Sequence, residues 1–249
     1  MLDRILTAAG VPQVASLRHP TAGRLRFHVH GRTESFRVRS YGAEREAWDR
    51  FLALLRPADT VFDIGAALGL YAVAAARLCP HGVVYAFEPD PPTRARLKAN
   101  AALNRLANLH AIPWAVGDRE TTMTLFSDGA DGFAPSLVAH DGPGAPRGEL
   151  PVPVRPLDAA LAAGELSCPD VLKLDVEGAE GMALRGAARL LAGAFGPPPR
   201  ALFLELHPAM LAALGDSAAD LRATLAAAGY ALAWEEARNA QALCLYTRS

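Results

Sequence analysis

Apolar and polar positions along the chain follow two periods that replace each other several times. Short apolar runs, typical of buried strands, lie at residues 60–64, 83–87, 109–116, 171–175 and 201–206. Apolar residues at helical spacing lie at residues 70–78, 91–106, 157–161, 177–191 and 217–228. This alternation predicts an α/β fold, in which a doubly wound parallel sheet is covered by helices on both faces.

The first 56 residues carry a different pattern, which predicts a small cap on this core. Its expected elements are a short amphipathic piece and loop at 1–20, a hairpin at 25–30 and 35–39, and a helix at 44–55. Because the strand–helix alternation starts only after this helix, we divide the chain into a cap, residues 1–56, and a core domain, residues 57–249.

Three further segments complete the predicted fold. Residues 122–126 are expected to extend the sheet, and residues 230–234 and 243–247 are expected to form a closing hairpin. Residues 127–151 are rich in Gly, Pro, Asp and Ser. A stretch of this kind in a compact domain is either a linker or a loop over a functional site.

An acidic residue and a glycine turn follow the first strand of the core. Asp63 ends the apolar run, Gly65 and Gly69 open the next helix, and Glu88 ends the following strand, 25 positions after Asp63. Ligands of open α/β sheets lie at the carboxyl ends of the strands, and an acid at the second strand end can accept hydrogen bonds from ribose hydroxyls. The sequence therefore predicts an adenosyl cofactor.

The turn itself indicates which adenosyl cofactor fits. A dinucleotide site has the spacing G-x-G-x-x-G, whereas here Gly65 and Gly69 are separated by Ala66, Ala67 and Leu68. Asp63 would also repel a pyrophosphate, because like charges at close range disfavour each other. The same acid suits S-adenosylmethionine, which carries an ammonium and a sulfonium. The alternative is an ordinary strand-to-helix turn without a ligand.

Further polar residues follow the later strands, at the edge where such a sheet binds its ligand. Asp175 ends one strand, and Glu205 and His207 lie at the end of another. Glu177 and Glu180 follow Asp175 on the first turn of a helix, where the helix dipole stabilises acids. For Glu180 this structural reading is favoured, whereas Asp175 is a candidate site residue.

Composition excludes several other classes of protein. The net charge of −1 argues against a general nucleic-acid binder, although the first 56 residues hold ten arginines and five acidic residues. Three widely spaced cysteines fit no disulfide or metal pattern. No run of 18 apolar residues predicts a membrane span, and the first residues lack a secretion signal. We expect a cytoplasmic protein.

Five motifs together resemble the FkbM family of S-adenosylmethionine-dependent methyltransferases. They are VFDIGA at 61–66 with Gly69, YAFEPD at 85–90, Leu157-Asp158, KLDVEGAE at 173–180 and LELHP at 204–208. The resemblance runs from about residue 57 to about residue 208, and the KLDVEGAE motif is far more specific than the glycine turn. It implies the class I methyltransferase sheet of about seven strands with the last one antiparallel. It also implies methyl transfer, usually to a hydroxyl of a polyketide, a sugar or another natural product.

The resemblance also implies roles for individual residues. The turn of Asp63, Gly65, Ala66 and Gly69 would shape the methionine pocket, and Glu88 would bind the ribose hydroxyls. Gly117 and Asp118 would contact the adenine edge, or Trp114 would pack against the ring. Trp114 is equally compatible with a position in the hydrophobic core. Asp118 is equally compatible with a structural role, in which its side chain stabilises the turn that contains it. One departure is Ala67, which stands where the family commonly has Asn.

A hydroxyl acceptor must lose a proton, so the sequence should contain a base. His207 is the first candidate, because an imidazole titrates near neutral pH, and Asp175 is the second. Asp175, Glu177, Glu205 and His207 have the ligand chemistry of a divalent cation, but no fixed spacing supports one, and no metal is expected.

Other functions stay open at this point. The chain can be a cofactor-binding module without turnover, which Ala67 would allow, or an N-methyltransferase of a small molecule. A nicotinamide-dependent reductase is disfavoured by the missing third glycine and the lack of a Tyr-x-x-x-Lys pair. The partner is expected to be a small molecule, a polyketide or a sugar, with no nucleic acid. Residues 24–39 and 127–151 are expected to roof the acceptor site.

Overall fold

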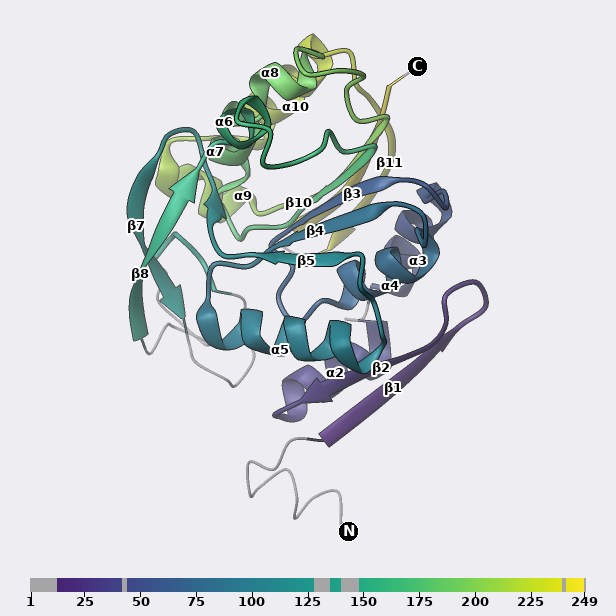
Figure 1. The fold of residues 1–249 in the computed structure, drawn as a ribbon. Helices are drawn as coiled ribbons and strands as arrows, with labels where there is room; N and C mark the ends of the chain where they lie inside the picture. Colours follow the sequence, from purple (N-terminus) through teal and green to yellow (C-terminus); the bar gives the residue numbers. More distant parts are fainter. Residues whose placement is uncertain (1–12, 42–43, 128–134, 140–147, 239–240, 249) are drawn as a thin grey trace.

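A seven-stranded sheet forms the centre of the molecule (Figure 1). The structure is a computed structural model, and it describes residues 13–41, 44–127, 135–139, 148–238 and 241–248. The strands of the sheet are β3 (Thr60–Ile64), β4 (Val83–Phe87), β5 (Leu109–Ile112), β9 (Val171–Leu174), β10 (Ala201–Leu206), β11 (Ala231–Arg238) and β12 (Gln241–Thr247). They follow the order β11-β12-β10-β9-β3-β4-β5, and only β12 runs against the other six. The predicted sheet with an antiparallel last strand is confirmed.

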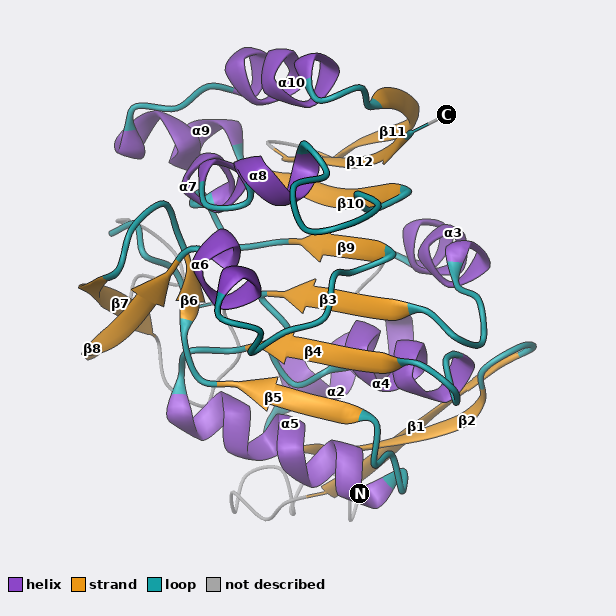
Figure 2. Ribbon diagram, turned by 45° about the horizontal axis from the view of Figure 1, so that its top comes forward, coloured by secondary structure: helices purple, strands orange, loops and turns teal. Residues whose placement is uncertain are grey.

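Helices cover both faces of this sheet, as Figure 2 shows. One face packs against α3 (Arg45–Leu54), α4 (Leu70–Leu78) and α5 (Pro91–Leu103). The other packs against α6 (Leu157–Ala162), α7 (Glu180–Arg185), α8 (Ala188–Leu191) and α10 (Ala218–Ala227). Successive side chains of a strand point to opposite faces, so Val61 lies in the first core and Phe62 in the second. This two-sided burial explains why the central strands are apolar at nearly every position.

The order of the strands fixes where a ligand can bind. From β3 the chain adds β4 and β5 on one side, and it then returns to place β9 on the other side of β3. In a doubly wound sheet the crevice lies at such a reversal, outside the carboxyl ends of the strands. The ends of β3, β4, β9 and β10 therefore surround the expected binding site.

A second, three-stranded sheet lies beside the first and corrects two predictions. Its strands are β6 (Ala115–Val116), β7 (Thr121–Ser127) and β8 (Gly148–Arg155). The predicted strand at 109–116 divides at Pro113, and the predicted strand at 122–126 pairs with β8 and does not extend the main sheet. The prediction of an unbroken loop over 127–151 is wrong from residue 148 onward, and residues 128–134 and 140–147 lie outside the described part.

Two prolines hid β8 from the sequence analysis. Pro151 and Pro153 pair with β7 on one side, whereas β6 pairs only with Val154 and Arg155 on the other. A proline cannot donate a backbone hydrogen bond, so it is tolerated in a strand where one edge has no partner. Both prolines lie in that part of β8.

The N-terminal cap differs from its prediction. Its hairpin consists of β1 (Gln13–His19) and β2 (Gly23–Val29), and the predicted second strand at 35–39 belongs to the helix α2 (Arg32–Ser40). The apolar–polar alternation of residues 35–39 was misleading, because Phe36 is 59% exposed while Val38 is buried. Glu34, Val38 and Tyr41 are buried at helical spacing. The predicted helix at 44–55 is confirmed as α3 (Arg45–Leu54). Residues 1–12 lie outside the described part. The domain boundary between the cap and the core after residue 56 stays a prediction.

Two asparagines of α5 attach the cap to the core. Asn100 accepts a hydrogen bond from the His28 N–H (2.7 Å) and donates one to the Leu68 carbonyl (2.9 Å). Asn104 accepts from the Arg26 N–H (3.0 Å) and donates to the Arg26 carbonyl (2.6 Å). The side chain of Asn100 is fully buried.

The predicted helix at 177–191 is divided into α7 and α8. A Cβ on Gly186, at the break, would lie 1.9 Å from the carbonyl oxygen of Gly117, so this glycine allows the two backbones to touch. A short helix, α9 (Pro208–Leu211), and a 3-10 turn (Ala212–Leu214) follow β10 and were not predicted. Within the described ranges, no helix has the length and apolar character that a membrane span requires.

Candidate active site

A cavity of about 270 Å³ opens at the carboxyl ends of the central strands. Its walls come from the β3–α4 turn, the ends of β4 and β9, the start of β6, and parts of α2 and β10. The predicted site residues that line it are Gly65, Ala66, Glu88, Trp114 and Asp175. The predicted residues outside its lining are Asp63, Gly69, Gly117, Asp118 and His207.

The glycine turn brings the ends of β3 and β9 into contact. Gly65 has a φ of 81°, and a Cβ at this position would lie 1.7 Å from the carbonyl oxygen of Asp175. Gly69, with a φ of 92°, starts α4 and lies against Leu97. Both positions need the left-handed conformation that glycine adopts without strain. Ala67, at a φ of 48°, adopts this conformation despite its side chain.

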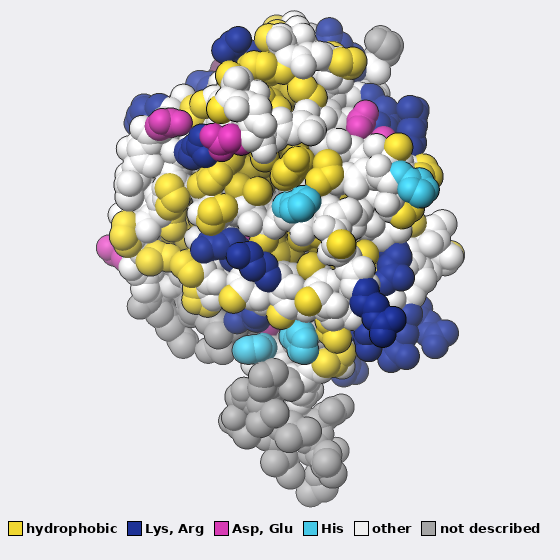
Figure 3. Space-filling model, viewed as in Figure 1, with side chains coloured by type: hydrophobic (Ala, Val, Ile, Leu, Met, Phe, Trp, Pro, Cys, Tyr) yellow, Lys and Arg dark blue, Asp and Glu magenta, His cyan; other side chains and the backbone are white. Residues whose placement is uncertain are grey.

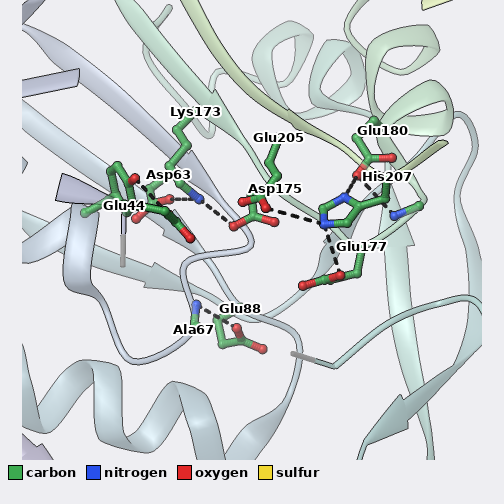
Figure 4. Close-up of polar contacts among 12 residues, drawn as sticks. Glu44, Asp63, Ala67, Glu88, Lys173, Asp175, Glu177, Glu180, Glu205 and His207 are labelled. Atoms are coloured by element: carbon green, nitrogen blue, oxygen red, sulfur yellow. Dashed lines mark hydrogen bonds and ion pairs between the residues drawn. The ribbon is translucent and has the colours of Figure 1, made fainter. Parts of the chain in front are cut away.

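Glu88 lies at the end of β4 with its carboxylate turned toward the glycine turn (Figure 4). Its two oxygens accept hydrogen bonds from the N–H groups of Ala67 (3.0 Å) and Asp90 (2.9 Å). The side chain is only 3% exposed, and this burial raises the pKa of Glu88 to about 7. Each carboxylate oxygen has a second lone pair, so Glu88 can still accept hydrogen bonds from a ligand.

Asp63, Lys173 and Asp175 form a row on one face of the sheet, in which Asp63 and Lys173 are buried and Asp175 is partly exposed. The Lys173 Nζ is 3.2 Å from Asp175 and 3.6 Å from Asp63, and it lies 4.7 Å from the centre of the Tyr71 ring. Burial opposes the charge on Lys173, but Asp175 and Asp63 raise its pKa above the ordinary value. Burial raises the pKa of Asp63, whereas for Asp175 the charges of Lys173 and His207 outweigh burial and lower it.

Asp63 does not reach the cavity, because Lys173 lies between it and Asp175 (Figure 4). Its carboxylate oxygens are buried and have no hydrogen-bond partner within the described residues apart from the ion pair with Lys173. Asp63 therefore holds Lys173 in place, and Lys173 in turn holds Asp175 at the wall of the cavity. A direct role of Asp63 in cofactor binding stays a prediction.

His207 is surrounded by carboxylates. Its Nδ1 is 2.7 Å from Glu180, and its Nε2 is 3.1 Å from Glu177 and 3.8 Å from Glu205. The imidazole is 3% exposed, and burial disfavours its charge. The hydrogen bond to Glu180 and the charge of Glu177 outweigh burial and raise the pKa of His207 to about 9. His207 is therefore protonated at neutral pH in this arrangement and lies behind the cavity wall.

Burial also acts on the carboxylates around His207. Burial, followed by the charge of Asp175, raises the pKa of Glu177 to about 7 and that of Glu205 to about 8. Glu180 is fully buried and also accepts a hydrogen bond from the Gly178 N–H (3.1 Å). Glu180 lies in the first turn of α7, as its predicted helix-dipole role requires, and it is in addition the hydrogen-bond partner of His207.

The far wall of the cavity carries Trp114. Its ring packs edge-on against Phe87 at 4.9 Å and lies under the Arg155 guanidinium at 5.3 Å. Gly117 and Asp118, the predicted adenine contacts, do not line the cavity. Asp118 pairs with Arg185 at 3.3 Å, so its carboxylate is held by another part of the protein. Its role toward adenine stays a prediction.

Several cavity residues were not predicted from the sequence. They are Glu44 before α3, Tyr71 of α4, Lys173 of β9 and Gln241 of β12, whereas Arg37 of α2 belongs to the segment 24–39 that was expected to roof the acceptor site. Tyr71 donates a hydrogen bond to Glu44 (3.3 Å), and Glu44 also pairs with Arg238 (3.2 Å). None of them follows the end of a strand, so the rule used on the sequence did not find them. Lys173 could have been found because it belongs to the KLDVEGAE motif. Of the described residues in 24–39, Arg37 belongs to the lining, and of those in 127–151, Pro135 and Leu137 do.

The sheet order, the single antiparallel strand and the site at the carboxyl ends define the class I S-adenosylmethionine-dependent methyltransferase fold. A solved structure described as the putative methyltransferase yhhF from Escherichia coli has this fold. It aligns with a TM-score of 0.51 and 13% sequence identity, over 94% of this chain and 99% of that one. At this identity the likeness shows the fold alone.

The sequence comparison then identifies the family. The family model described as the methyltransferase FkbM domain matches residues 63–232, and the chain belongs to this family. One curated relative, the 31-O-demethyl-FK506 methyltransferase FkbM of Streptomyces tacrolimicus, is 32% identical over 56% of this chain and 51% of its own length. Another, the hexuronic acid methyltransferase AglP of Haloferax volcanii, is 29% identical over 67% of this chain and 65% of its own length. The chain thus spans between half and two thirds of these relatives.

Proposed function

We propose that this protein transfers a methyl group from S-adenosylmethionine to a hydroxyl group of a sugar, a glycan or a polyketide-like natural product. The observation that carries this proposal is the placement of Glu88 and Asp175 on the walls of one cavity, on either side of the Gly65 turn. A carboxylate on each side of a glycine turn suits a ligand with a ribose at one end and cationic groups at the other.

The donor would occupy the cavity from Trp114 to Asp175. Glu88 would accept hydrogen bonds from the ribose hydroxyls, and Trp114 and Phe87 offer apolar surface to the adenine. The methionine end would lie along Gly65 and Ala66. Because Gly65 has no Cβ, the backbone of this turn can pack directly against the backbone of Asp175. Asp175, which Lys173 and His207 keep ionised, would face the ammonium or the sulfonium.

The acceptor would enter from the side of Arg37, Glu205 and Gln241, which line the same cavity. Its hydroxyl oxygen forms a bond to the methyl carbon as the carbon–sulfur bond breaks, and the bonding pair stays on sulfur as a neutral thioether. The reaction mainly needs the two reactants in line, and such alignment can supply about 7–11 kcal/mol of barrier reduction. The hydroxyl proton must pass to a neighbouring base.

For that base the sequence proposed His207 first and Asp175 second. The contacts of His207 favour a positioning role, because both ring nitrogens face carboxylates and the ring does not line the cavity. Asp175 lines the cavity and is ionised, which supports it as the group that orients the acceptor hydroxyl. Arg37 at this end supports an acceptor that carries an acidic group.

The printed functions of the two relatives support a hydroxyl acceptor. One acts on 31-O-demethyl-FK506, a polyketide, and the other on a hexuronic acid. Both are rich in oxygen, and the first is named for the oxygen that receives the methyl group. An amine acceptor, and a cofactor-binding module without turnover, are the competing functions.

Calorimetry with S-adenosylhomocysteine tests the donor site. We expect binding by the wild-type protein, a loss of at least tenfold in affinity for Glu88→Ala, and no change for the exposed carboxylate variant Glu165→Gln. An absence of binding by the folded wild-type protein would refute the proposal. Labelled S-adenosylmethionine offered with uronic acids, neutral sugars, amino sugars and macrolides then identifies the acceptor. Donor binding without transfer to any of these would favour the binding module.

A further inference from the structure

We propose that Asp175, Glu205 and His207 form a binding site for a divalent metal ion at the acceptor end of the cavity. Each of them offers one ligand atom, and the three atoms lie within 4.8 Å of one another. They come from the ends of the neighbouring strands β9 and β10, so the sheet itself holds them together. The sequence spacing did not reveal the site, because its ligands meet only across the two strands.

The imidazole of His207 is oriented as in metal sites. A ligating histidine usually donates a hydrogen bond from its other ring nitrogen to a carboxylate or carbonyl, which fixes the tautomer and the ring plane. Here Nδ1 lies 2.7 Å from the fully buried Glu180. Glu180 is held in turn by the Gly178 N–H. The other nitrogen, Nε2, is thereby directed at the three carboxylates of Asp175, Glu177 and Glu205 (Figure 4).

The buried Nε2 has no hydrogen-bond partner among the described residues. Its neighbours are carboxylate oxygens, at 3.1 Å for Glu177 and 3.8 Å for Glu205. A ring nitrogen of a 97% buried imidazole that lies among acidic side chains and contacts them only as ion pairs, without a hydrogen bond, is unusual for a merely structural histidine. A cation between Nε2 and the carboxylates would replace the proton on Nε2, which passes to solvent, and would contact all of these atoms.

The charges at this end of the cavity favour such a cation. Four carboxylates, those of Asp175, Glu177, Glu180 and Glu205, face a single imidazole. Lys173 offsets part of this charge, because it pairs with Asp175 at 3.2 Å, but it is shared with Asp63 and forms no ion pair with Glu177, Glu180 or Glu205 within the described residues. Buried charges are tolerated when they are paired or when they coordinate a metal. A divalent ion would balance two of the carboxylates.

The ligand types narrow the identity of the ion. Carboxylate oxygens suit Mg²⁺ and Mn²⁺, whereas one imidazole and no thiolate argue against a closed structural zinc site. Asp175 and Glu205 line the cavity, so open coordination positions of the ion would face the acceptor. The ion would bind the acceptor hydroxyl and favour loss of its proton to Glu177, which also lines the cavity. This role rests on the proposed function, whereas binding of the ion does not.

A titration with Mn²⁺, followed by electron paramagnetic resonance, tests the site directly. After treatment with a chelator and its removal, we expect one Mn²⁺ ion per chain, which Mg²⁺ displaces. Glu205→Gln should weaken Mn²⁺ binding at least tenfold, and His207→Asn should do the same. Glu165→Gln removes an exposed carboxylate that does not line the cavity and pairs with Arg155, so this variant should bind Mn²⁺ as the wild type does.

Binding of S-adenosylhomocysteine by each variant shows that it has folded. A folded wild-type protein that takes up no Mn²⁺, or two folded variants that bind Mn²⁺ unchanged, would overturn the proposed site. If Mn²⁺ binds but methyl transfer continues at full rate in excess chelator, the role in activating the acceptor is refuted. If S-adenosylhomocysteine does not bind, the proposed function fails, and the Mn²⁺ titration still decides on the site.

Discussion

Gly65 and Asp175 touch through their backbones, since a Cβ on Gly65 would lie 1.7 Å from the Asp175 carbonyl oxygen. The Asp175 N–H also donates a hydrogen bond to the Ile64 carbonyl, at 3.0 Å. The turn that would carry the donor and the strand end that would face the acceptor are therefore one rigid unit. A change at Gly65 acts on both.

Gly65→Ala should lower both the free energy of unfolding and the affinity for S-adenosylhomocysteine. The left-handed conformation costs an L-residue about 1–2 kcal/mol, and the clash with Asp175 adds to it. Gly23→Ala is the matched control, because Gly23 has a φ of 71° and open space around it. Urea denaturation should show a larger loss for Gly65→Ala than for Gly23→Ala. Equal losses would mean that the contact with Asp175 relaxes at no cost.

Ala67→Asn should stabilise the protein. Ala67 has a φ of 48°, and Asn tolerates this conformation better than Ala does. We expect a gain of about 0.5 kcal/mol in urea denaturation, and Ala67→Gly should give a gain of similar sign. If the affinity for S-adenosylhomocysteine stays unchanged in Ala67→Asn, the Asn that the family commonly carries serves the backbone. A loss of stability in both variants would contradict this account.

Cofactor affinity should rise with pH through about 7. Glu88 has its pKa raised to about 7 by burial, and only its ionised form has both oxygens free to accept from the ribose hydroxyls. Below that pH a proton must be lost on binding, so the affinity at pH 6 should be about tenfold lower than its plateau. Calorimetry between pH 5.5 and 8.5 measures this dependence. Glu88→Gln cannot titrate, and its weaker binding should vary much less with pH.

Lys173→Met should be strongly destabilising, by about 3–5 kcal/mol, because it leaves buried carboxylates without a partner. The double variant with Asp63→Asn should recover part of this loss, since Asp63 then needs no cation. The exposed Lys98→Met is the control and should change the free energy of unfolding by less than about 0.5 kcal/mol. Additive effects of the two substitutions would show that Asp63 and Lys173 do not act as a pair.

Much of the fold was readable from the sequence because the central strands are buried on both faces. The strands at 60–64 and 83–87 and the helix at 70–78 agree with the structure to the residue. The errors concern elements whose local pattern opposes their tertiary setting. Pro151 and Pro153 concealed β8, and the alternation of residues 35–39 concealed α2. In both places a neighbour that is distant in the sequence decides the conformation.

The candidate site was readable where a polar residue ends a strand. This rule found Glu88 and Asp175, which line the cavity. It could not show that Lys173 separates Asp63 from the cavity, or that Glu180 holds His207 from 27 residues away. Glu44 enters from the cap, whose placement depends on side-chain contacts with α5. Its position in the site follows from packing and leaves no local signal.

The hydrogen bonds of Asn100 have a consequence for how this family can diversify. One amide group joins the backbone of β2 to the Leu68 carbonyl, inside the turn proposed to cradle the donor. Displacing the β1–β2 hairpin would thus shift the β3–α4 turn, which is proposed to bind S-adenosylmethionine, so the hairpin and this turn cannot evolve independently. Chimaeras that import a foreign hairpin to change acceptor choice should retain donor affinity only if the graft presents its own N–H to this amide.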